Sequence, residues 1–125
     1  MRIGADYYPE HWEKERWKTD AEMMVKANIK VIRIGEFAWS LYEPEEGKYE
    51  FDWMDEALDF FGKYGIKVVM CTPSATPPKW MIDKYPDILQ NDIHGNPKLF
   101  GTRKHYCFNS ETYREKTKKL NTLIA

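Results

Sequence analysis

The sequence has 125 residues, a formal net charge of −1, 42% hydrophobic residues and 31% charged residues. That length suits about one average domain, and the near-neutral charge gives no electrostatic basis for a nucleic-acid or anionic-membrane partner. No apolar run approaches the roughly 20 residues that a bilayer span needs. Residues 1–4 also lack the layout of a signal peptide. We therefore expect a cytoplasmic protein.

The first half of the chain alternates strand-like and helix-like segments. We expect a strand at residues 2–8, a helix at 12–28 and a second strand at 30–35. The expected helix carries apolar residues near helical spacing, including Trp17, Ala21, Met24 and Val25. The second strand is a β-branched run that a single arginine, Arg33, interrupts.

A second helix is expected after a loop at residues 36–51. Asp52 is predicted to be its N-cap, and Gly65 is predicted to end it. Residues 66–71 then form a near-continuous apolar run, which is typical of a strand covered on both faces.

Residues 72–109 form a long proline-rich connection that contains five aromatic residues. Such a length is usually functional or disordered, and the aromatic content favours function. One short helix is predicted at residues 79–84, and a last helix is predicted to start at Ser110. The final residues, Leu123, Ile124 and Ala125, carry no capping signal. We interpret this as truncation, with a frayed terminal helix as the alternative.

Three strand–helix alternations predict an α/β fold with a parallel sheet and crossover helices. An eight-unit barrel of the TIM type needs roughly 250 residues, about twice this length. The expectation is therefore the first three β/α units of a truncated (β/α)8 barrel. Residues 1–125 would be the N-terminal fragment of the catalytic barrel domain.

The candidate functional residues lie where the predicted strands end, because barrel active sites form at the carboxyl ends of the strands. Aromatic planes together with carboxylates suit a polar, flat-faced ligand such as a sugar. The first two loops supply the candidates Asp6, Tyr7, Tyr8, Glu10, His11, Trp12, Glu36, Trp39 and Tyr42.

Arg33 is the most informative residue within a strand. Strand alternation places it on one face with Val31, while Ile32 and Ile34 share the other face. If the isoleucines pack against helices, Arg33 points into the barrel, where a guanidinium needs a carboxylate partner. Asp6 and Glu36 are both possible partners, and a solvent-exposed Arg33 remains the alternative.

The remaining candidates are weaker by spacing alone. Arg103 is a loop arginine that solvent could equally well surround, and the three histidines (His11, His94, His105) are interpreted as satisfied polar residues. Cys71 is read as a small buried hydrophobic residue. With two cysteines and no C-x-x-C pair, the chain offers weak grounds for a metal site.

Four segments, taken together, resemble the start of the family 42 glycoside hydrolases, which are β-galactosidases built on a β/α barrel. The segments are Ile3–Trp12, Arg33–Ser40, Thr72–Trp80 and Arg103–Ser110. They occur in order along the whole chain.

The resemblance implies a retaining mechanism with two glutamates about 5 Å apart. In the family the acid/base follows an asparagine, and no Asn-Glu pair occurs here. The resemblance also implies that Arg103 binds galactose and that Arg33 keeps the nucleophile ionised, with its partner beyond residue 125. Cys107 would be one of four zinc ligands in some members. No cofactor is implied for the chemistry, and a structural zinc and a homotrimer are implied for the intact protein.

The expected function is that of a fragment of a retaining β-galactosidase that is inactive alone and acts, when intact, on terminal β-D-galactosides. Two alternatives stay open. One is a non-catalytic β/α module that binds a sugar or a partner. The other is a related barrel glycosidase with another sugar specificity, because most hydroxyl-reading groups lie outside these residues.

Overall fold

The computed structural model describes residues 3–102 and 104–125 of the chain. It divides into two compact units that are each described separately. The sheet unit comprises Met1–Gly35 and Glu50–Cys71. The loop unit comprises Glu36–Tyr49 and Thr72–Ala125.

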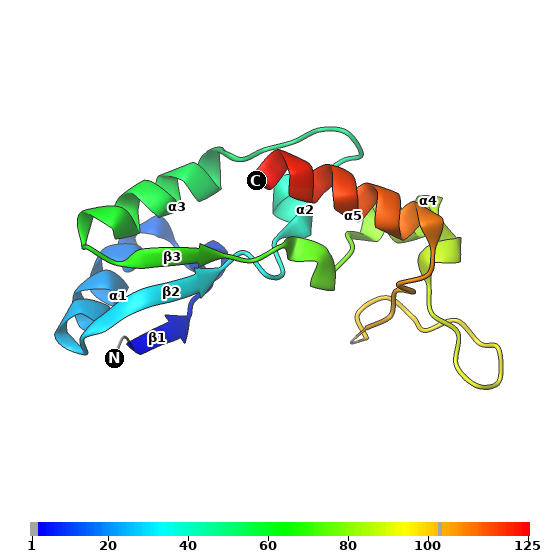
Figure 1. The fold of residues 1–125 in the computed structure, drawn as a ribbon, viewed down its shortest axis with the longest axis horizontal. Helices are drawn as coiled ribbons and strands as arrows, with labels where there is room; N and C mark the ends of the chain where they lie inside the picture. Colours follow the sequence, from blue (N-terminus) through cyan, green and yellow to red (C-terminus); the bar gives the residue numbers. More distant parts are fainter. Residues whose placement is uncertain (1–2, 103) are drawn as a thin grey trace. The chain divides into compact units, whose positions relative to one another are not determined.

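The sheet unit contains three parallel strands in the order β1-β2-β3, with bounds Ile3–Asp6, Ile29–Ile34 and Lys67–Met70. Helix α1 (Lys14–Lys26) connects β1 to β2, and helix α3 (Asp52–Lys63) precedes β3. Figure 1 shows α1 behind the strands and α3 running alongside β3. The order of neighbouring parallel strands matches their order in the chain, so the structure is of the predicted α/β class.

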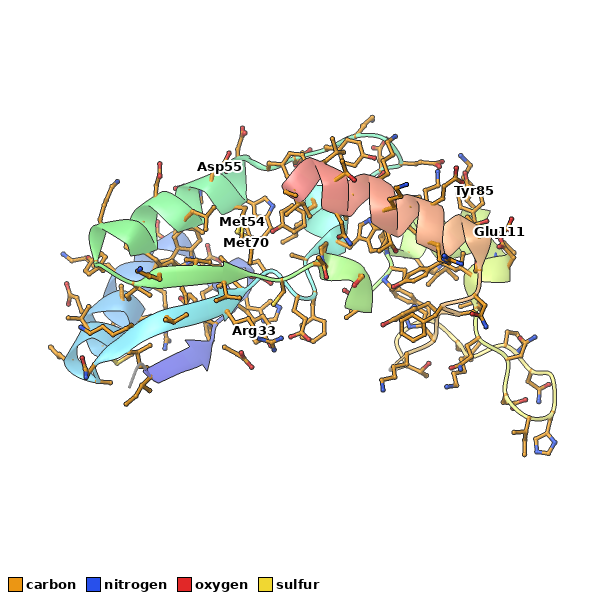
Figure 2. The ribbon with its side chains drawn as sticks, viewed as in Figure 1. Arg33, Met54, Asp55, Met70, Tyr85 and Glu111 are labelled. Carbon is orange, nitrogen blue, oxygen red and sulfur yellow. The ribbon has the colours of Figure 1, made fainter. Side chains whose placement is uncertain are left out.

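The core of the sheet unit follows from the predicted periodicities. Ile32 and Ile34 are fully buried on one face of β2, as strand alternation requires. Trp17 of α1 and Phe61 of α3 are also buried, and their ring centroids lie 6.1 Å apart. Figure 2 labels Met54, another buried residue of α3. Spacing thus identified Trp17, Ile32 and Ile34 correctly, whereas Val25, named on the same apolar helix face, is 42% exposed.

Two local predictions for the sheet unit were wrong. The N-cap of α3 is Phe51 rather than Asp52, and no side chain caps this end, so Asp52 is the first helical residue. Strand β3 is an edge strand, and its Val69 is 51% exposed instead of being covered on both faces. Gly65 does end α3 as predicted, because its φ of +69° is a conformation that favours glycine.

The loop unit is built from short elements. Its helices are α2 (Trp39–Tyr42), α4 (Lys79–Lys84) and α5 (Glu111–Ile124), with 3-10 turns at Pro73–Ala75 and Pro86–Ile88. The predicted bounds of α4 are confirmed. Ser110 caps α5 by accepting a hydrogen bond from the backbone N–H of Tyr113, which places the start of that helix where the sequence predicted.

Aromatic side chains form the core of the loop unit. Trp39 and Tyr42 are fully buried, and Tyr106 stacks on Tyr113 with ring centroids 4.7 Å apart. The phenol of Tyr113 donates to the backbone oxygen of Ser74 at 2.7 Å, and burial raises the pKa of that phenol to about 12. The described part of the long proline-rich connection therefore packs around aromatic side chains, as its aromatic content predicted.

Candidate functional site

Arg33 lies at the carboxyl end of β2 and pairs with the residue beside it on β1. In the parallel register Asp6 is opposite Arg33, and the two side chains form a two-point contact. The Nε donates to Oδ1 of Asp6 at 2.8 Å, and Nη2 donates to Oδ2 at 3.2 Å. Figure 2 labels Arg33 at this end of the strand. Such a bidentate pair fixes the plane of the guanidinium.

The Arg33–Asp6 pair changes the expectation that the carboxylate partner of Arg33 lies beyond residue 125. Within this chain, Arg33 has Asp6 as a partner. Its side chain is 40% exposed, on the face opposite the buried isoleucines. The hydrogen bonds from Arg33 hold the pKa of the Asp6 carboxyl below its usual value. Asp6 is therefore ionised at neutral pH and unsuited to act as a general acid.

The first loop contains fewer ligand-binding candidates than the sequence suggested. Tyr7 is buried and donates to Oδ2 of Asp20 at 2.9 Å, so it belongs to the core. The rings of Tyr8 and His11 stack at 5.2 Å. Trp12 is 47% exposed and carries the guanidinium of Arg16 over its ring.

Glu10 is the candidate in this loop whose carboxyl pKa is raised. Both of its carboxylate oxygens are buried and have no hydrogen-bond partner among the residues that the structure describes. Burial raises the pKa of this carboxyl, as desolvation disfavours the ionised form. A raised pKa is typical of a general acid, but Glu10 does not line the groove described below.

The second loop contributes to the core more than to a site. Trp39 donates from Nε1 to the buried carboxylate of Glu43 at 3.0 Å, and the backbone N–H of Gly47 donates to the same carboxylate at 2.8 Å. Trp80 donates to the backbone oxygen of Glu43 at 2.9 Å. Glu43 was not singled out from the sequence, and its spacing four residues after Trp39 on a short helix was the available signal.

A groove of about 580 Å³ lies within the loop unit. Phe37 and Phe100 line it and are 39% and 50% exposed, so they present aromatic surface to a ligand. The groove brings together side chains from three stretches of the sequence, at residues 36–40, 75–79 and 100–106. Its lining comprises Glu36, Phe37, Ser40, Ala75, Thr76, Pro77, Pro78, Lys79, Phe100, Gly101, Thr102, Lys104, His105 and Tyr106.

The three histidines have different environments. His105 is 4% exposed, and its Nδ1 lies 2.8 Å from the backbone oxygen of Thr102. His94 lies in an exposed turn in which its backbone N–H donates to Asp92, and His11 stacks on Tyr8. The interpretation as satisfied polar residues was wrong for His105, because its buried Nε2 has no partner among the described residues.

Arg103, the residue predicted to bind substrate, lies outside the described residues. Its sequence neighbours Thr102 and Lys104 both line the groove. Lys104 has a φ of +53°, a left-handed backbone conformation that is uncommon for a residue other than glycine.

The two cysteines are free and half-buried. Cys71 is less buried than predicted, and its Sγ lies 3.7 Å from Nη1 of Arg33. Across residues 3–102 and 104–125, no three His, Cys, Asp or Glu side chains gather closely enough to hold a metal ion. A tetrahedral zinc site needs four ligands, so Cys107 alone does not fit one.

Across residues 3–102 and 104–125, every helix is too short or too polar to cross a membrane.

Comparison with known proteins identifies the family. The profile of the family described as "Beta-galactosidase" (glycoside hydrolase family 42) matches residues 6–125. A β-galactosidase of Thermus thermophilus is 54% identical over 123 residues, and one of Haloferax lucentense is 48% identical over 124 residues. These alignments cover 98% and 99% of this chain, and 19% of each relative.

Solved structures agree with this assignment. A β-galactosidase from Rahnella sp. R3 superposes with a TM-score of 0.96 at 42% identity, covering all of this chain and 19% of that one. The enzyme from Halorubrum lacusprofundi superposes with a TM-score of 0.94 at 45% identity, covering 99% and 19% respectively. The chain belongs to glycoside hydrolase family 42. It spans about a fifth of the length of the relatives that it matches.

Proposed function

We propose that this chain supplies the first three β/α units of a (β/α)8 barrel in a retaining β-galactosidase, with residues 1–125 as the N-terminal part of the catalytic domain. The observation that carries the proposal is the family match along nearly the whole chain, combined with coverage of only 19% of each relative. The sequential parallel order β1-β2-β3 supports it, because neighbouring barrel strands follow one another in the chain.

In the proposed reaction, one glutamate protonates the glycosidic oxygen while the other attacks the anomeric carbon and forms a covalent galactosyl-enzyme. Water then attacks this intermediate, and the first glutamate accepts its proton. These 125 residues contain no Asn-Glu pair of the kind that carries the family's acid/base. The acid/base is therefore assigned to another part of the intact enzyme. The resemblance places the nucleophile at the end of the seventh barrel strand, so the isolated chain is expected to be inactive.

This chain's proposed contribution is electrostatic and positional. Arg33, oriented by Asp6, would place its positive charge where the nucleophilic glutamate arrives and keep that carboxylate ionised. Arg103 would hydrogen-bond galactose beside the cleaved bond. The chemistry requires no cofactor in this scheme.

Further proposals concern the intact protein. Cys107 would be one ligand of a structural zinc, which would hold loops in place and take no part in the reaction. Its three partners would come from outside this chain. We also propose a cytoplasmic location, a terminal β-galactoside as substrate and a homotrimeric assembly.

A chromogenic β-galactoside assay tests the function. The 125-residue chain and the full-length protein that contains it are purified from a host that lacks its own β-galactosidase. We expect turnover by the full-length protein alone. A full-length Arg33→Ala variant is expected to lose at least about a hundredfold in kcat, since aligned electrostatic groups contribute on that scale. Turnover by the 125-residue chain would refute the assignment of the glutamates.

A non-catalytic sugar-binding module is the second candidate, and the groove with exposed Phe37 and Phe100 is the observation in its favour. This candidate predicts that the isolated chain binds galactose in a calorimetric titration while neither protein hydrolyses galactosides. Hydrolysis by the full-length protein decides against it.

A further inference from the structure

The groove of the loop unit contains a buried histidine that has no role in the proposed mechanism. His105 lines this groove and is 4% exposed. Its ring packs edge to face against Phe100 and Tyr106, with centroid distances of 5.7 and 5.9 Å. A polar ring at this depth normally satisfies both of its nitrogens, because an unpaired buried polar atom is costly.

The hydrogen bond of His105 defines its tautomer. A backbone carbonyl oxygen can only accept, so the 2.8 Å contact with Thr102 makes Nδ1 the donor. In the neutral ring, Nε2 is then a bare acceptor. This Nε2 is buried and has no partner among the described residues. The ring therefore offers one acceptor that a donor from outside can satisfy.

The groove around His105 suits a neutral ligand rich in hydroxyl groups. Phe37 and Phe100 supply exposed aromatic faces, and Ser40 supplies a hydroxyl group. The hydroxyl of Thr76 donates to the backbone oxygen of Phe37 at 3.0 Å, so it can serve a ligand as an acceptor. Lys79 pairs with Asp83. The two other charged lining residues, Glu36 and Lys104, have opposite signs. The lining as a whole thus favours no strongly charged ligand.

We propose that His105 is a sugar-binding residue whose Nε2 accepts a hydrogen bond from a ring hydroxyl of a galactoside in this groove. The proposal rests on the proposed function, and it adds a contact that Arg33 and Arg103 do not supply. Because Nε2 is buried in this structure, admitting the hydroxyl requires a neighbouring side chain to move. The proposal assigns that movement to Phe100, which packs against the ring of His105 and is 50% exposed. The hydroxyl could belong to the galactose or to the sugar that leaves.

Two substitutions separate this role from a structural one. In His105→Asn, the side-chain amide nitrogen can replace Nδ1 and keep the bond to Thr102, but nothing replaces Nε2. In His105→Gln, the longer side chain places an acceptor oxygen near the position of Nε2 and gives up the bond to Thr102. A sugar-binding role needs the acceptor, whereas a role in holding the turn at Thr102 needs the donor.

The test uses the full-length protein with both variants and the wild type. The measurements are KM and kcat for an aryl β-galactoside and for lactose, and inhibition constants for free galactose and free glucose. We expect His105→Asn to weaken sugar affinity about tenfold, the scale of one hydrogen bond, and His105→Gln to stay within about twofold of the wild type. A change in galactose inhibition places the contact on the galactose. A change confined to lactose and glucose places it on the leaving sugar.

Other outcomes overturn the proposal. Three patterns would mean that the Nε2 acceptor does not bind sugar. They are wild-type sugar affinity in both variants, an equal loss of affinity in both, and a loss of affinity in His105→Gln alone. If the wild-type protein hydrolyses no galactoside, the proposed function fails separately. Calorimetric galactose binding by the same three proteins then decides the role of His105 by the same pattern.

Discussion

The two units of this chain hold their residues in place by different means. In the sheet unit, regular strands and helices satisfy the backbone, and apolar side chains such as Ile32, Ile34 and Phe61 fill the core. In the loop unit, short helices and turns alternate with irregular chain, and buried polar groups join distant segments. Examples are the bonds from Trp39 and Trp80 to Glu43.

This difference bears on why the loop unit buries polar side chains. Strands and helices place side chains at regular intervals and pair their backbone groups with one another. Few polar groups in them therefore need a side-chain partner. An irregular segment must satisfy its backbone groups one by one with side chains, so it buries polar groups such as those of Glu43 and His105. Two of the proposed ligand contacts, those of Arg103 and His105, belong by sequence to the long connection at residues 72–109.

The largest expected effect is on packing in the sheet unit. Phe61→Ala removes a fully buried ring that contacts Tyr7 and Trp17, and we expect a loss of about 3–5 kcal/mol in the free energy of unfolding. Urea unfolding measures the loss, and amide hydrogen exchange of β2 locates it. Val69→Ala, at a 51% exposed position of the same unit, is the control. Similar effects of the two substitutions would contradict this account of the core.

A smaller effect is expected from a buried polar group of the loop unit. Glu43→Gln keeps one acceptor oxygen but turns an amide toward the donors Trp39 Nε1 and Gly47 N, so one donor loses its partner. We expect a loss of about 1–3 kcal/mol in unfolding free energy. Glu45→Gln, in the exposed pair with Lys48, should change stability by less than about 0.5 kcal/mol. An unchanged Glu43→Gln would show that these hydrogen bonds do not order the loop unit.

The smallest effect is expected from the pH dependence of Glu46. Lys116, Lys84 and Tyr85 donate to its carboxylate and lower its pKa from 4.5 to about 2. A carboxyl whose pKa is depressed by folding stabilises the native state above its unfolded pKa, and this contribution disappears as the pH falls toward the folded value.

Thermal unfolding between pH 6 and pH 2 checks this behaviour. Because Glu46→Gln cannot titrate, the variant should lose less stability than the wild type below about pH 4.5. Tyr85, labelled in Figure 2, is the donor whose removal in Tyr85→Phe should give an intermediate result. Parallel curves for the wild type and Glu46→Gln would show that the Lys116–Glu46–Lys84 cluster does not contribute.

Much of the fold was predictable because local patterns dictate it. The alternation of strands and helices, the buried face of β2, the helix at Lys79–Lys84 and the cap at Ser110 all follow from side-chain spacing and backbone chemistry. The exposure of Val69 did not follow, because an apolar run does not reveal whether other elements cover both faces of the strand.

The candidate sites were less predictable than the fold. Arg33 was recognised from its strand position, and the resemblance to family 42 supplied the roles proposed for Arg33, Arg103 and Cys107, which remain predictions. Periodicity did not show that Tyr7 and Trp39 are core residues, since aromatic residues in loops suit both packing and binding.

The sequence by itself determined the family, the order of the elements and the residue types available at the strand ends. Tertiary structure alone decided that Asp6 is a partner of Arg33, because the register of β1 against β2 places the two residues opposite each other. It also decided that Phe37 and His105 share a groove. Residues far apart in the chain come into contact only through tertiary packing, and local sequence spacing does not predict such contacts.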